Sequence, residues 1–68
     1  MFITKNAREH IYVGHNDVVG RDFVDVRIYS VQGGHRFPTK RGVMIPIAAL
    51  PGLIDALTAM LPPPGSKD

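Results

Sequence analysis

The chain has 68 residues, carries eight Lys and Arg against six Asp and Glu, and contains no cysteine. This length allows a single domain with a marginal core, since such a chain buries only about 60% of its unfolded surface. The absence of cysteine excludes disulfides and thiolate zinc sites, and the three histidines are too scattered to form a metal pair on one helix, so we expect neither metal nor cofactor. Small domains without such links are commonly stabilised by a partner subunit, which predicts a homodimer.

The first half of the chain predicts strands joined by a hairpin. Residues 11–13 are a short run of strand formers that reaches turn-type residues at 14–17, and Gly20 marks a hairpin corner. Residues 22–31 give the clearest strand, because their alternation separates an apolar face, expected to be buried, from a mixed face that is at least partly wet. The apolar set is Val24, Val26 and Ile28, and the mixed set is Phe23, Asp25, Arg27 and Tyr29.

A basic segment follows the turn at residues 32–34. Residues 33–42 read GGHRFPTKRG, with three Lys or Arg and no acidic residue, which is typical either of a site for an anionic partner or of a solvated loop. Residues 37–39 open an extended return segment, and residues 42–47 predict a last strand. Pro46 cannot donate to a strand ladder, so it marks a strand end or an edge.

The C-terminal part predicts one helix that begins between Ala48 and Pro51 and stops before the prolines at 62–64. Its surface is apolar nearly all round, so we expect one side to pack on its own sheet and the other on a second copy. A membrane-surface helix would carry a face rich in Lys and Arg, which this stretch lacks. The domain is expected to span 1–61, with a flexible Pro-rich tail at 62–68. The predicted dimer contacts are Leu50, Leu53, Ile54, Leu57, Met60 and Leu61.

Three segments carry a resemblance to a known family. Residues 24–29 read VDVRIY, residues 38–43 read PTKRGV, and Leu50 and Leu53 begin the helix, while Gly20-Arg21 falls on a hairpin turn. In order and spacing they resemble the positive cofactor 4 family of transcriptional coactivators, of the single-stranded-DNA-binding type. The resemblance implies an α+β fold, with a curved four-stranded antiparallel sheet, one C-terminal helix and dimerisation through the helices. It also implies binding of single-stranded DNA without strict sequence preference, and roles in transcription or DNA unwinding.

The residues themselves fit such a ligand, because single-strand binders combine cations along a groove with flat side chains for stacking. For Tyr29 and Phe23, packing in the core or dimer interface is an equal alternative, and for Arg27 the unliganded state is expected to be an ion pair with Asp25. RNA stays open as a second ligand, and transcription proteins as partners. The predicted nucleic-acid contacts are Arg21, Arg27, Tyr29, Arg36, Phe37, Lys40 and Arg41.

Departures from the family pattern remove charge and stacking surface. They leave a rival interpretation, in which the same dimer scaffold binds an acidic protein, and a third, a duplex-DNA binder of the β-ribbon kind. Nothing in the chain forms a catalytic motif or a phosphate loop, so we expect no enzyme. The lack of a long apolar span favours an intracellular protein in the cytoplasm, nucleoid or nucleus, with no membrane partner. The departing positions are Ser30 and Leu50 in place of Trp, Val18 and Val19 before the hairpin glycine, and Glu9 and Ile11 where cations are common.

Overall fold

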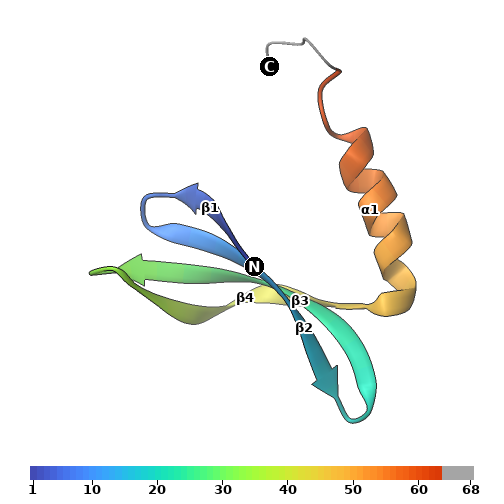
Figure 1. Ribbon diagram of the computed structural model, residues 1–68, viewed down its shortest axis with the longest axis horizontal. Helices are drawn as coiled ribbons and strands as arrows, with labels where there is room; N and C mark the ends of the chain where they lie inside the picture. The colour runs from blue at the N-terminus through green and yellow to red at the C-terminus, as the bar shows by residue number, and fades with distance from the viewer. Residues whose placement is uncertain (64–68) are drawn as a thin grey trace.

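The computed structural model describes residues 1–63, which form one antiparallel sheet followed by one helix (Figure 1). The strands are neighbours in chain order, β1-β2-β3-β4, and Figure 1 shows the sheet twisted and curved. This architecture confirms the α+β class, the four strands and the C-terminal helix. The elements are β1 (Phe2–Asn6), β2 (Glu9–Val18), β3 (Arg21–Gln32), β4 (His35–Pro46), a 3-10 turn η1 (Ile47–Ala49) and α1 (Leu50–Ala59).

Two-residue turns set the register of the hairpins. Val19 and Gly20 join β2 to β3 with φ of 52° and 73°, and Gly33 and Gly34 join β3 to β4 with φ of 56° and 81°. Positive φ at both positions matches the right-handed twist of a hairpin, and glycine adopts it without strain. Val19 is a β-branched residue in that region, which costs about 1–2 kcal/mol, and its side chain is 95% exposed.

Three predicted boundaries were wrong. Residues 14–17 are part of β2 and not a turn, because the tight turn at 19–20 continues the β2–β3 ladder as far as Val18 and Arg21. The return segment and the last strand are a single strand, β4, so the basic segment expected in a loop lies largely within a strand. β1 was not located from the sequence; it is joined to β2 by the Met1 and Val13 backbones, with Val13 N donating to Met1 O at 2.8 Å.

The sheet has two different faces, because residues paired across antiparallel strands share a face. One face, the aliphatic face, carries the predicted apolar set of β3 and its partners in the register. Its residues are Ile3, Ile11, Val13, Val24, Val26, Ile28, Val43 and Ile45. The other, the aromatic face, carries Phe2, His10, Tyr12, Arg27, Tyr29 and Arg36.

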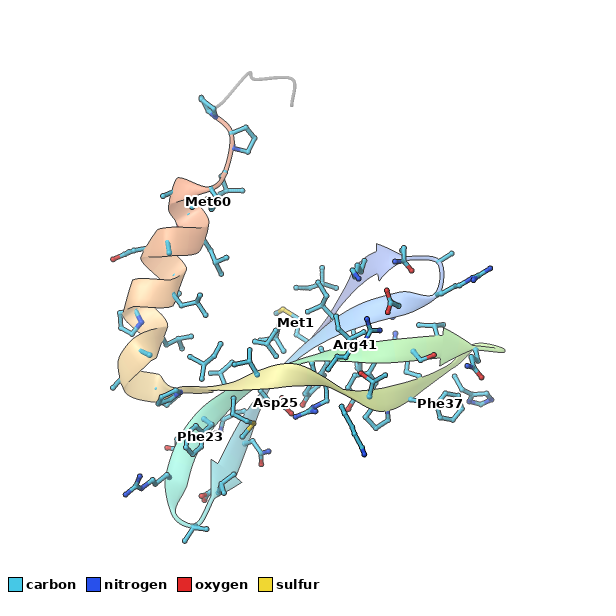
Figure 2. The ribbon with its side chains drawn as sticks, turned by 180° about the vertical axis from the view of Figure 1, so that it is seen from behind. Met1, Phe23, Asp25, Phe37, Arg41 and Met60 are labelled. Carbon is cyan, nitrogen blue, oxygen red and sulfur yellow. The ribbon has the colours of Figure 1, made fainter. Side chains whose placement is uncertain are left out.

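The helix begins at Leu50, as predicted, with Pro51 in its first turn, where the missing N–H needs no partner. The expectation that one side packs on its own sheet is wrong: α1 rises away from the side of the sheet that carries Met1 and Arg41 (Figure 2). Leu57 is 59% exposed and Met60 79%, while Leu50 and Leu53 are half-buried. The short η1 connection directs α1 off the end of β4, so the aliphatic face stays uncovered. Pro62 and Pro63 follow in exposed, irregular backbone, and the rest of the predicted tail lies outside the described residues.

As one chain the molecule is open. No residue within 1–63 is classed as buried. The radius of gyration is 14.4 Å, against about 11 Å for a compact chain of this length. The accessible surface is 5474 Å², roughly 1,200 Å² more than a folded monomer of this mass exposes.

Candidate nucleic-acid interface

Three aromatic rings from three strands meet on the aromatic face. The ring centroids of Phe2 and Tyr12 are 5.2 Å apart, those of Phe2 and Tyr29 5.1 Å, and those of Tyr12 and Tyr29 5.3 Å. Tilted and edge-to-face contacts at these distances are favourable and hold the rings in place. Tyr12 lies over Gly14, where a Cβ atom would collide with its ring, so Gly14 makes room for the cluster.

A guanidinium lies over this cluster. The Arg36 Cζ atom is 4.1 Å from the centroid of the Phe2 ring, a cation–π distance, and Arg36 Nε donates to His10 Nδ1 at 3.1 Å. His10 therefore accepts one of the five N–H donors that a guanidinium carries. The strand register places Arg36 there, opposite Val31 on β3. A cation thus lies directly beside the ring surface.

Arg27 is held between β3 and β4. Its guanidinium lies 3.2 Å from Asp25 Oδ1, and its Nη1 donates to Thr39 O at 3.0 Å. The predicted ion pair with Asp25 is therefore confirmed in the unliganded chain. Gly42 faces Arg27 across the ladder, and a Cβ there would lie 2.8 Å from Val26 O and 3.1 Å from Arg27 Cα. The close approach of the two strands requires glycine at this position.

The register of β4 shifts opposite Ile28, and the shift brings cations to the edge of the sheet. Thr39 Oγ1 donates to Ile28 O at 2.7 Å and accepts from Arg41 N at 3.2 Å, which fixes the irregular backbone of residues 39–41. Such bulges reorient side chains at sheet edges. Because β4 is an edge strand, Lys40 and Arg41 lie at the rim between the two faces.

A second polar cluster lies across this rim, on the aliphatic side of the sheet. Arg41 pairs with Glu9, and Glu9 also accepts from Lys5 Nζ at 3.0 Å and from Asn6 Nδ2 at 3.3 Å. The hydrogen bond from Arg41, followed by those from Lys5 and Asn6, lowers the pKa of Glu9 to about 2. Beside them is an open hollow of about 590 Å³. Its lining residues are Asn6, Ala7, Arg8, Glu9, Ser30, Thr39 and Arg41.

The seven predicted contact residues are only partly brought together. Arg27, Tyr29 and Arg36 share the aromatic face with the ring cluster, and Arg21 lies on the same face at the far hairpin. Alternation along β4 places Lys40 with Gly42, toward that face. Phe37, opposite Ser30, and Arg41 belong to the other face, as Figure 2 shows for Arg41 against Asp25 and Phe23.

Sequence reasoning missed three members of the cluster: Phe2, His10 and Tyr12. A signal for two of them was present, because a two-residue turn at 19–20 pairs His10 with Tyr29 and Tyr12 with Arg27. Phe2 had no comparable signal. Within residues 1–63, no group of three or more His, Asp or Glu is placed to hold a metal ion. No helix in that part of the chain is long and apolar enough to cross a membrane.

No family model and no curated protein sequence matches the chain, but three solved structures resemble it. BPSL1147, a PC4 homolog from Burkholderia pseudomallei, is 32% identical in its orthorhombic crystal form, with a TM-score of 0.80 over 87% of this chain and 81% of that one. Its tetragonal form gives a TM-score of 0.77 over 87% and 88% of the two chains, also at 32% identity. The MoSub1–ssDNA complex is 26% identical, with a TM-score of 0.55 over 98% of this chain and 82% of that one.

The fold and the ring-bearing face define a small α+β subunit with a four-stranded antiparallel sheet and a trailing helix. Identity of 32% over most of both chains goes beyond likeness of fold. The chain belongs to the PC4 (positive cofactor 4) family, which its sequence resembles.

Proposed function

We propose that this protein binds single-stranded DNA as a homodimer, without strict sequence preference, and acts inside the cell in transcription regulation or other DNA transactions. The observation that carries the proposal is the ring cluster of Phe2, Tyr12 and Tyr29 beside the Arg36 guanidinium. The chain belongs to the PC4 family, and the related MoSub1 was solved with single-stranded DNA bound.

The chemistry of the surface suits unpaired bases. A base exposed from a strand presents a flat π-face, and stacking on an aromatic side chain contributes roughly 1–3 kcal/mol per base whatever its identity. Arg36 and Lys40 lie along β4, where phosphates are within reach when bases lie on the rings. In this arrangement the sugar–phosphate backbone follows the rim of β4 while the bases turn onto the aromatic face.

The homodimer is supported by what a single chain leaves uncovered. The aliphatic face and the apolar surface of α1 are both exposed. The excess accessible surface of roughly 1,200 Å² exceeds the 800 Å² or so that each partner buries in a standard interface. A second copy offers the same two surfaces in return, so a two-fold arrangement covers both at once.

A titration with fluorescent oligothymidine tests the proposal. We expect sub-micromolar to micromolar affinity in low salt, weaker binding to duplex DNA, and a log affinity that falls linearly with log salt as counterions are released. An oligouridine arm compares RNA with DNA. No binding at low ionic strength would contradict the proposal and favour the interaction module, for which an acidic protein is the partner.

A further inference from the structure

Glu9 is the one carboxylate among the seven residues that line the hollow at the rim of β4. It is paired with Asn6 of β1 on one side and with Ser30 of β3 on the other. Its side chain is 21% exposed, and its two oxygens accept from Lys5, Asn6 and Arg41. The carboxylate is therefore fixed by three donors from β1 and β4.

Without this carboxylate, the hollow would suit phosphate. Arg8 and Arg41 both line it, and the Lys5 ammonium lies next to it. A guanidinium binds a carboxylate and a phosphate with the same pair of N–H donors, so one anion excludes the other. Glu9 thus occupies the position at Arg41 that a phosphate oxygen would take.

The pair is open to exchange. The Arg41 side chain is 62% exposed, and ion pairs at such surfaces are worth only about 0–1 kcal/mol. Exchange cannot be driven by mild acid, because the neighbouring donors hold the pKa of Glu9 at about 2. At neutral pH the carboxylate stays charged, and a ligand must displace it from Arg41.

We propose that Glu9 is an internal competitor for phosphate: it holds Arg41 in the unliganded protein and weakens the binding of single-stranded DNA at the rim of β4. The inference rests on the proposed function. Strand binding then proceeds in two parts, with bases stacking on the aromatic face and one phosphate exchanging with Glu9 for Arg41. Glu9 sets how tightly the second part closes.

The test compares Glu9→Gln with Asp17→Asn, which makes the same charge change on the same strand but outside the hollow. In oligothymidine titrations at low salt, Glu9→Gln should tighten binding about three- to tenfold and steepen the salt dependence by about 0.7, the increment for one further phosphate on a single strand. Asp17→Asn should change the affinity less than twofold. The gain from Glu9→Gln should disappear when it is measured in an Arg41→Ala background.

Weaker binding by Glu9→Gln, a gain no larger than that of Asp17→Asn, or a gain that persists with Arg41→Ala would overturn the inference while leaving the proposed function intact. Failure of both wild type and Glu9→Gln to bind would overturn both. Glu9→Ala supplies a second variant with the same expected direction, and circular dichroism of each variant establishes that the fold is kept.

Discussion

The two faces of the sheet differ in what they lack. On the aromatic face the rings contact one another and the cations have acceptors, so one chain completes the surface by itself. On the aliphatic face the apolar side chains end at solvent, and α1, which is apolar enough to cover them, stands clear of the sheet (Figure 1). The binding surface is thus complete in each subunit, while stability depends on a second copy.

The largest effect is expected from a charge on the helix. Leu57→Asp should abolish the dimer and, with it, the cooperative fold, because an unpaired carboxylate in an apolar interface costs about 3–5 kcal/mol. Thermal unfolding by circular dichroism and size-exclusion chromatography measure the two losses. Thr58→Asp places the same charge off the leucine stripe and should remain dimeric. A folded Leu57→Asp dimer would contradict the role given to α1.

Removing a ring from the aromatic face should reduce binding and leave the dimer in place. Tyr29→Ala is expected to weaken oligothymidine binding roughly 5- to 100-fold, the loss of one stacked base. Tyr29→Phe keeps the ring and should bind within about twofold of wild type, a comparison that separates stacking from hydrogen bonding. Equal losses in the two variants would show that the hydroxyl, not the ring face, makes the contact.

The rim between the faces should contribute charge and not stacking. Lys40→Ala combined with Arg41→Ala is expected to weaken binding about tenfold at low salt, evenly across base compositions, and to flatten the salt dependence by about one. Titrations of oligothymidine and oligocytidine over a range of salt concentrations measure both quantities. If the slope is unchanged, these two residues do not contact the phosphates.

The smallest effect concerns the pH dependence of stability. The pKa of Glu9 is lowered from 4.5 to about 2 in the folded chain, so its ion pairs stabilise the fold above pH 4.5 and lose this contribution as the pH falls toward 2. The difference in Tm between wild type and Glu9→Gln should therefore shrink over this range. A difference that is constant from pH 6 to pH 2 would mean that the Glu9 charge has no part in it.

Local patterns predicted the centre of the sheet well. Strict alternation in β3 identified its two faces, and the change to helical spacing after Pro46 placed the start of α1 correctly. Residues 14–17 look like a turn in isolation, but they continue β2 because the tight turn at 19–20 extends the ladder through them. β1 is held by backbone contacts with β2, for which its five residues carry no distinctive signal.

The site was harder to predict than the fold for two physical reasons. The irregular backbone at 39–41 depends on the Thr39 contacts with Ile28 and Arg41, and no local pattern indicates that Arg41 and Lys40 diverge there. The helix is apolar nearly all round, so its sequence gives no direction for packing. A pattern of this kind indicates that the helix must be covered without indicating which surface covers it.

Sedimentation equilibrium of the intact chain at micromolar concentration tests most directly whether the uncovered face and helix belong to a dimer. A folded species at twice the chain mass of 7.5 kDa is the expected result. A cooperatively folded monomer at that concentration would contradict it, because the exposed aliphatic face and α1 would then be stable without a second copy.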